Sequence, residues 1–146
     1  MPVSNLVGKA IVINVPSSNQ EITLDMVLNH PCIQEAEFLL FYTGWDQYYE
    51  TEQYMEGYPL LSIELCEWIT ANQIKGIGID AMSVDALDDQ TLTRHHLLLE
   101  KKDLVIIENL TNLNQLPNQE TMMFIALPLH YKNADGAMAR VVAIVS

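Results

Sequence analysis

The sequence is poor in basic residues and has no long apolar run. It holds 7 Lys and Arg against 19 Asp and Glu, so its formal net charge is −12. Nucleic acids and anionic membrane surfaces bind to basic faces, and we therefore expect neither as a partner. A membrane-spanning helix needs about 18 consecutive apolar residues, and the sequence contains no such run.

Cysteine is also scarce. Cys32 and Cys66 match no spacing typical of a metal or redox motif, and two thiols in a chain of this size are typical of a reduced, cytoplasmic protein. The first 15 residues carry Lys9 inside their apolar stretch and no small-residue cleavage site, so they do not predict a signal peptide. The motifs GxGxxG, GxxxxGKS/T, HExxH and GxSxG are absent.

What is present is the composition of a folded chain. Hydrophobic residues make up 49% and charged residues 18% of 146 residues, which predicts a single domain over 1–146. Short apolar runs and their flanking turn residues predict the elements. We expect strands at 9–15, 37–42, 76–79, 104–107, 121–129 and 140–145, and helices at 23–29, 63–72 and 91–101.

Two local signals refine this pattern. Thr23 and Ser62 are candidate N-caps of the first two helices. Asp135-Gly136 predicts a turn between the last two strands, which would then form an antiparallel ribbon. The chain starts β-α-β-α-β and ends in strands, so we predict an α/β or α+β domain with a mixed sheet and few helices.

A histidine and a glutamate are the first candidates for chemistry. Among His30, His95, His96 and His130, we single out His96, which lies on a predicted helix. Glu108 ends a predicted buried strand, where a sheet delivers side chains into a cleft. Imidazole and carboxylate together are a usual part of a zinc or manganese site. The alternative is that His95 and His96 are ordinary, partly exposed residues of the predicted helix.

Two further groups of residues follow predicted strands. Asp80, Ser83 and Asp85 come directly after the strand at 76–79, and they could bind a ligand or form a turn. The loop 43–59 begins Thr-Gly-Trp and holds Trp45 and four tyrosines. These aromatic residues could wall a pocket for an aromatic substrate, or they could pack the loop onto the core.

An ordered series of short segments resembles the C-terminal two thirds of the cyclase family that contains bacterial kynurenine formamidases and isatin hydrolases. The segments are Thr43-Gly44-Trp45, Pro59-Leu60-Leu61-Ser62, Gly76-Ile77-Gly78-Ile79-Asp80, Ser83-Val84-Asp85, His96, Ile107-Glu108-Asn109-Leu110, Asn112-Leu113, Ala126-Leu127-Pro128-Leu129 and Arg140-Val141-Val142-Ala143. The resemblance runs from about Val7 to the end of the chain.

The resemblance implies a swivelling β/β/α domain, a metal-dependent amide hydrolase activity and assembly into homo-oligomers. It implies His96 and Glu108 as metal ligands, with His95 as the alternative because Leu98-Leu99 permits that register too. Zinc or manganese would be the metal. Trp45, Asp80, Ser83 and Asp85 would contact a small aromatic amide, and no catalytic residue is assigned.

The sequence departs from the family at one place. The family motif HxGTHxDxPxH, which supplies most metal ligands and a proton-transfer histidine, is absent, so we expect a chain truncated at its N-terminus relative to the family. Two ligands are fewer than the three protein ligands of a usual catalytic zinc site. The expected function is an impaired arylformamidase-like hydrolase that holds little metal or none. The alternative is a catalytically inactive, cyclase-like binding or assembly module.

Overall fold

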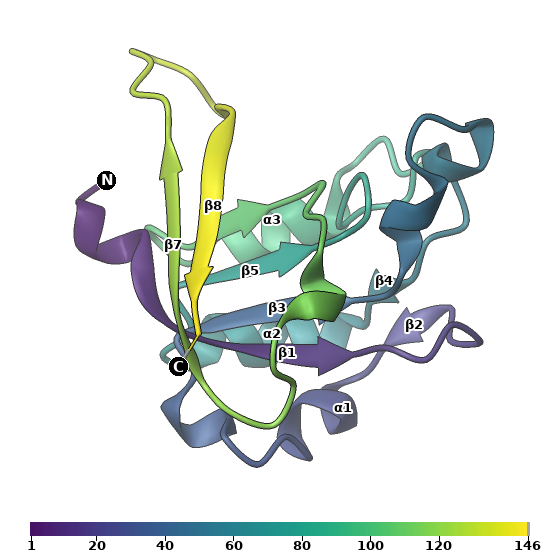
Figure 1. The fold of residues 1–146 in the computed structure, drawn as a ribbon. Coiled ribbons are helices and arrows are strands. Elements are labelled where there is room, and N and C mark those ends of the chain that lie inside the picture. The colour runs from purple at the N-terminus through teal and green to yellow at the C-terminus, as the bar shows by residue number, and fades with distance from the viewer. Residues whose placement is uncertain (146) are drawn as a thin grey trace.

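The computed structural model describes residues 1–145, and a six-stranded mixed sheet forms its centre (Figure 1). The strand order is β6-β5-β3-β1-β7-β8, in which β6, β5, β3 and β1 are parallel neighbours and β7 and β8 join antiparallel. The strands are β1 (Val7–Asn14), β3 (Phe38–Tyr42), β5 (Gly76–Ile79), β6 (Val105–Ile107), β7 (Met122–Pro128) and β8 (Ala139–Ile144).

The three α-helices of the described chain are α1 (Leu24–Leu28), α2 (Ile63–Ala71) and α3 (Thr93–Leu99). A separate two-stranded parallel sheet joins β2 (Glu21–Ile22) to β4 (Leu60–Leu61). This mixed α+β architecture with few helices confirms the predicted fold class. Within residues 1–145 no helix is long and apolar enough to cross a membrane.

The helices cover one face of the sheet, where the larger apolar core lies (Figure 1). Strands β1, β3 and β5 contribute Ile11, Leu39 and Ile77 to this core, and α2 contributes Leu65 and Ile69. All five side chains have no exposed surface. Complete burial at this many positions explains why the parallel strands read as continuous apolar runs in the sequence.

A second, smaller core covers the opposite face. Phe38 and Leu40 point to this side and pack with Phe124 of β7 and with Leu110 and Leu113 from the segment that follows β6. The rings of Phe38 and Phe124 lie 5.1 Å apart. Because β1, β3 and β5 are buried on both faces over most of their length, ligands can reach these strands mainly at their ends.

All of the predicted strands and helices are present, with bounds that differ by at most two residues. Ser62 caps α2 as predicted, because its hydroxyl accepts a hydrogen bond from the Leu65 amide at 3.1 Å. Thr23 occupies the N-cap position of α1 but makes no side-chain capping hydrogen bond. The prediction missed β2 and β4, because each is only two residues long and pairs with a distant segment.

The predicted antiparallel ribbon is also present, and we call residues 122–144 the β7–β8 ribbon. Its register pairs Met123 with Ile144 and Ile125 with Val142. The turn that joins the two strands stands clear of the rest of the molecule (Figure 1). β8 is the last strand in the sheet order, so its outer edge faces no other strand of the described chain.

Candidate functional site

The parallel strands place the predicted site residues along one edge of the sheet. β3, β5 and β6 run in the same direction, and each is followed directly by polar residues at its carboxyl end. Thr43 follows β3, Asp80 follows β5 and Glu108 follows β6. The carboxyl ends of parallel strands are the usual location of ligand sites in open sheets, and this edge is therefore the candidate site.

Asp80 organises the start of the loop after β3. Its side chain has no exposed surface and accepts hydrogen bonds from the Thr43 amide at 3.0 Å, the Thr43 hydroxyl at 2.6 Å and the Gly44 amide at 2.7 Å. Burial raises the pKa of Asp80, and the hydrogen bonds from Thr43 and Gly44 oppose that rise. Gly44 has φ of +73°, a conformation that glycine adopts without strain. Asp80 therefore fixes the chain direction immediately before Trp45.

The aromatic loop 43–59 folds back over the strand ends and is held there by hydrogen bonds. Trp45 packs edge-on against Tyr48 and Tyr58, with ring centroids 4.9 and 6.3 Å away, and its indole nitrogen donates to the Tyr54 carbonyl at 3.2 Å. The Tyr54 hydroxyl in turn donates to Asn109 Oδ1 at 2.9 Å. The loop thus uses its aromatic residues for packing, and it also leaves part of Trp45 accessible.

A small cavity lies on one side of Trp45. Its volume is about 50 Å³, and Thr43, Trp45, Tyr48 and Gly57 are among the residues that line it. Neither His95 nor Glu108 is among its lining residues. The cavity is smaller than an aromatic amide would need, since ligand pockets are typically several hundred Å³.

Asp85 organises the part of the site next to α3. It is 1% exposed, and its two carboxylate oxygens accept hydrogen bonds from the amides of Arg94 at 2.6 Å and His95 at 3.1 Å. These are first-turn amides of α3, which Leu92 leaves without a side-chain cap. Asp85 therefore caps α3 from eight residues before the helix begins, and this contact fixes the rotation of the helix about its axis.

That rotation places the His95 ring between two carboxylates. His95 Nδ1 lies 2.8 Å from Asp85 Oδ2, and Nε2 lies 3.4 Å from Glu108 Oε1. An ionised carboxylate only accepts hydrogen bonds, so Nδ1 is the atom that donates to Asp85. Glu108 is itself oriented by the Val84 amide, which donates to Oε1 at 3.0 Å. His95 Nε2 and Glu108 therefore converge at a point that solvent reaches, since each side chain is about one quarter exposed.

Two other predicted site residues, His96 and Ser83, have different surroundings. His96 is exposed on the next position of α3, and within residues 1–145 its ring makes no hydrogen bond or ion pair. The Ser83 hydroxyl accepts a hydrogen bond from the Asp85 amide at 3.2 Å. His95, the alternative ligand, is thus the histidine that the fold brings to Glu108.

A metal ion fits this arrangement only in part. Within the described residues no group of three or more His, Cys, Asp and Glu side chains is placed to hold one. A carboxylate that holds one ring nitrogen, as Asp85 holds His95 Nδ1, commonly orients a histidine ligand, and here it directs Nε2 toward Glu108. The described residues therefore offer two convergent metal ligands, His95 and Glu108, which are fewer than a complete set of protein ligands.

Two residues of the site, Asn109 and Arg94, were given no role from the sequence, and Tyr54 was predicted only as one of the four tyrosines of the aromatic loop. Tyr54 and Asn109 join the aromatic loop to the end of β6, and Arg94 donates from Nε to the Leu61 carbonyl at 2.6 Å. Asn109 has φ of +58°, which asparagine tolerates better than most residues. An Asn directly after a buried strand and a glutamate could have indicated such a turn, whereas nothing local indicates the partners of Tyr54 and Arg94.

Comparison with known proteins shows the family of this chain. A sequence model of the family described as Putative cyclase matches residues 1–86, more than half of the chain. This chain belongs to the cyclase family. Among relatives, a kynurenine formamidase from Erythrobacter litoralis is 30% identical over 142 residues, which are 97% of this chain and 62% of that protein. A kynurenine formamidase from Bacillus cereus is 34% identical over 136 residues, 93% of this chain and 62% of that protein.

Solved structures of cyclase-like proteins have the same fold. One described as a potential metal-dependent hydrolase with cyclase activity is 27% identical and superposes with a TM-score of 0.78 over 97% of this chain and 67% of its own. An isatin hydrolase bound to thioisatinate is 21% identical, with a TM-score of 0.84 over 99% of this chain and 62% of its own. The chain thus spans 62% of the length of the kynurenine formamidases it matches.

Proposed function

We propose that this cyclase-family chain forms part of a metal-dependent amide hydrolase site of the kynurenine formamidase type. The observation that carries the proposal is the position of His95, whose Nε2 lies 3.4 Å from Glu108 Oε1 while Nδ1 is held by buried Asp85. The names of the relatives support a hydrolase that depends on metal. An aryl formamide or a cyclic amide is the substrate class that agrees with those names.

In this proposal each residue has a defined role. His95 and Glu108 are two metal ligands, and Asp85 is a positioning residue that keeps the hydrogen on Nδ1 so that the Nε2 lone pair is free to bind. A bound zinc or manganese ion would polarise the amide carbonyl and activate water. Trp45, set by Asp80 and Thr43, would stack on the aromatic part of the substrate.

We further propose that the 146 residues alone are a poor catalyst. A catalytic zinc usually has three protein ligands, and the chain supplies two, so metal binding should be weak and activation of water inefficient. A cyclase-like binding or assembly module is the second candidate, and the same pair of donors without a third supports it. The two candidates differ in whether the His95–Glu108 pair binds metal at all.

Metal titration of matched histidine variants tests the proposed ligands. Calorimetry with zinc and with manganese should show weak binding by the wild type, with a marked loss in His95→Ala and in Glu108→Gln. His96→Ala is the control, because it removes a neighbouring histidine that lies exposed one position further along α3. Equal loss in His95→Ala and His96→Ala would contradict the assignment, and no binding by the wild type would favour the binding module.

Activity is measured separately with N-formylkynurenine and added zinc or manganese. Turnover by the 146-residue chain should lie near background, because the ligand set is incomplete. Fast turnover that His95→Ala abolishes would show that these residues form a complete site and that the proposed impairment is wrong. The same turnover in His95→Ala would contradict the whole assignment of the site.

A further inference from the structure

The middle of the aromatic loop 43–59 lies between two glycines. Gly44 and Gly57 both have positive φ, +73° and +88°. Between them lie two short 3-10 helices, Trp45–Tyr48 and Glu52–Met55. The chain can change direction at both glycines without strain, so side-chain contacts set the position of the part between them.

The first of these contacts ends on the residue that follows Glu108. The Tyr54 hydroxyl donates to Asn109 Oδ1 at 2.9 Å, and Tyr54 is 6% exposed. The Trp45 indole nitrogen donates to the Tyr54 carbonyl at 3.2 Å, so one residue holds both the tryptophan and the end of β6. The Asn109 amide donates to the Ala81 carbonyl at 2.9 Å, which fixes this turn to the segment after β5. Tyr54 therefore connects Trp45 to the turn that sets the backbone direction of Glu108.

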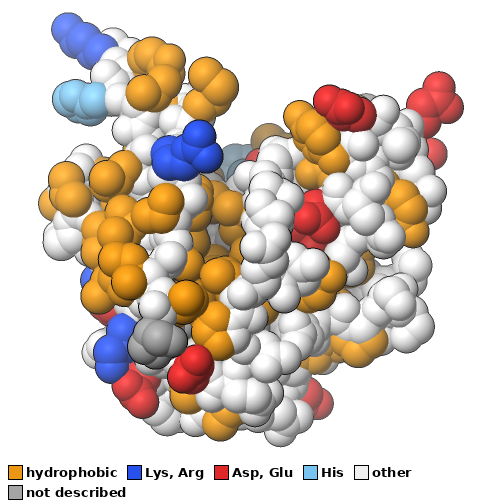
Figure 2. All heavy atoms as spheres, viewed as in Figure 1, with side chains coloured by type: hydrophobic (Ala, Val, Ile, Leu, Met, Phe, Trp, Pro, Cys, Tyr) orange, Lys and Arg blue, Asp and Glu red, His pale blue; other side chains and the backbone are white. Residues whose placement is uncertain are grey.

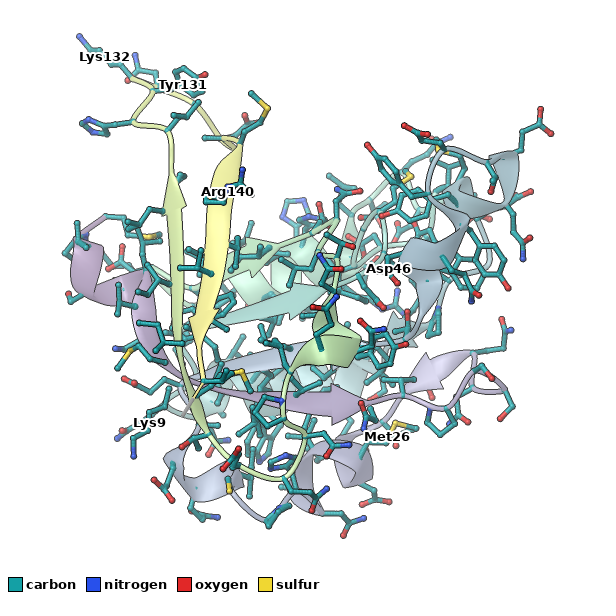
Figure 3. The ribbon with its side chains drawn as sticks, viewed as in Figure 1. Lys9, Met26, Asp46, Tyr131, Lys132 and Arg140 are labelled. Carbon is teal, nitrogen blue, oxygen red and sulfur yellow. The ribbon has the colours of Figure 1, made fainter. Side chains whose placement is uncertain are left out.

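The second contact starts from Asp46, the residue after Trp45. Asp46 Oδ2 accepts hydrogen bonds from the Thr111 hydroxyl at 3.1 Å and from the Asn112 amide at 3.4 Å. Figure 3 shows Asp46 where the aromatic loop approaches the segment that follows β6. We call the Tyr54 and Asp46 contacts the two bridges. They join the loop on either side of Trp45 to residues within four positions of Glu108.

Charge repulsion opposes the two bridges. Residues 43–59 hold four acidic side chains and no basic one, and Figure 2 shows acidic side chains at the end of the molecule where this loop lies. The site beside the loop adds the carboxylates of Asp80 and Glu108. Burial raises the pKa of Asp80, and the nearby charge of Asp46 raises it further. A divalent cation bound at Glu108 would reduce this repulsion and favour the position of the loop that the bridges hold.

We propose that Tyr54 and Asp46 are positioning residues that couple the aromatic loop to the metal ligand Glu108. This inference rests on the proposed function, in which Glu108 binds metal and Trp45 contacts the aromatic part of the substrate. Coupling of this kind is reciprocal, so a loop held by its bridges strengthens metal binding, and a bound metal ion holds the loop. The stacking surface for an aromatic amide is therefore in place when the metal ligand is in place.

NMR of the metal-free chain tests the coupling without any metal. The Val84 amide donates to Glu108 Oε1, so its resonance reports on the position of that carboxylate. Tyr54→Phe removes the first bridge and should shift the Val84 amide resonance. Glu108→Gln should in turn shift the indole N–H resonance of Trp45.

Thr51→Val is the matched control. The Thr51 hydroxyl donates to the Tyr48 carbonyl at 2.6 Å, so this variant also removes one hydrogen bond of the loop, but one that stays within the loop. A purely structural loosening of the loop would affect both variants alike. Coupling through Asn109 predicts that the Val84 resonance moves in Tyr54→Phe alone. Circular dichroism of both variants establishes that they remain folded.

Zinc titration measures the consequence for the site. Tyr54→Phe and Thr111→Val each remove one bridge, and each should weaken zinc binding about tenfold, as is usual for groups that orient a metal ligand. The double variant should lose more than either single variant, because the second bridge still holds the loop in each of them. Thr51→Val should bind zinc as the wild type does.

The outcomes separate this coupling from the proposed function. An unchanged Val84 resonance in Tyr54→Phe would overturn the coupling, whether or not the chain binds zinc. Equal shifts in Tyr54→Phe and Thr51→Val would also overturn it. If the wild type binds no zinc while the Val84 shift is confined to Tyr54→Phe, the proposed function is contradicted and the connection between the loop and Glu108 is supported.

Discussion

Single buried polar residues decide the geometry of the candidate site. Asp80 and Asp85 have almost no exposed surface, and each accepts hydrogen bonds from backbone amides, Asp80 from Gly44 in a distant segment and Asp85 from Arg94 in the following helix. Asp80 sets the direction of the aromatic loop, and Asp85 sets the rotation of α3. Their removal should affect the site through the backbone, even where no ligand touches them.

Replacement of Asp80 by asparagine should destabilise the protein by about 2–4 kcal/mol. The side chain would present an NH₂ group to a site that contains only donors, the amides of Thr43 and Gly44 and the Thr43 hydroxyl. Chemical denaturation measures this change. Asp88→Asn, at an exposed position nearby, should unfold at the wild-type denaturant concentration. Equal midpoints for Asp80→Asn and the wild type would show that Asp80 does not hold the loop.

Tyr54 should make stability depend on alkaline pH. Burial, with a smaller contribution from the charge of Asp80, raises the pKa of Tyr54 to about 12, above its usual value near 10. The folded state therefore retains a proton that the unfolded state releases, so this contribution to stability is complete below about pH 10 and is lost as pH rises through about 12.

The measurement is the free energy of unfolding between neutral pH and the alkaline range. Tyr54→Phe should be less stable at neutral pH, because it lacks the hydrogen bond to Asn109, and should show a shallower alkaline fall. Tyr131→Phe, in the exposed turn of the ribbon, controls for the loss of one phenol group. If the free energy of unfolding of Tyr54→Phe fell with alkaline pH as steeply as that of the wild type, Tyr54 would not be the group responsible.

At the scale of elements, β5 shows how closely its neighbours approach. A Cβ at Gly76 would meet Val105, including its backbone carbonyl oxygen at 2.8 Å, whereas a Cβ at Gly78 would meet the ends of the Leu110 and Leu40 side chains at 2.5 and 2.9 Å. Side-chain ends can move, but a backbone carbonyl in a hydrogen-bonded strand moves only with its strand.

Gly76→Ala should therefore cost more stability than Gly78→Ala, about 3 against about 1–2 kcal/mol. Denaturant unfolding of the two variants, each with circular dichroism as a check on secondary structure, measures the difference. The pair is well matched because both glycines lie on the same buried strand, two residues apart. A larger loss in Gly78→Ala would mean that the β5–β6 contact adjusts more easily than the side chains packed on β5.

The elements also show what could be predicted from the sequence. β5 and the N-cap at Ser62 follow from local patterns, because buried runs and capping residues act within a few positions. The rotation of α3 about its axis could not be predicted from local patterns. The residue that caps it, Asp85, is separated from the helix by a turn, so local spacing alone could not choose between His95 and His96. Zinc or manganese as the metal, cytoplasmic location and the roles of Ser83 and Trp45 stay predictions.

At the scale of the whole molecule, charge and apolar surface are separated in space. The acidic surplus lies outside the β7–β8 ribbon, and exposed apolar side chains lie along the ribbon. The composition predicted an acidic chain, but it could not show that the acids avoid one face, since that depends on which strands lie at the end of the sheet.

The position of β1 inside the sheet has a consequence for how the chain is made. β1 is near the start of the sequence, yet one of its two neighbours is β7, which a ribosome synthesises more than a hundred residues later. Until β7 emerges, the nascent chain carries an open edge at β1, a site where strands of other chains can pair. Synthesis rate and chaperone access during this interval should therefore influence the yield of native protein.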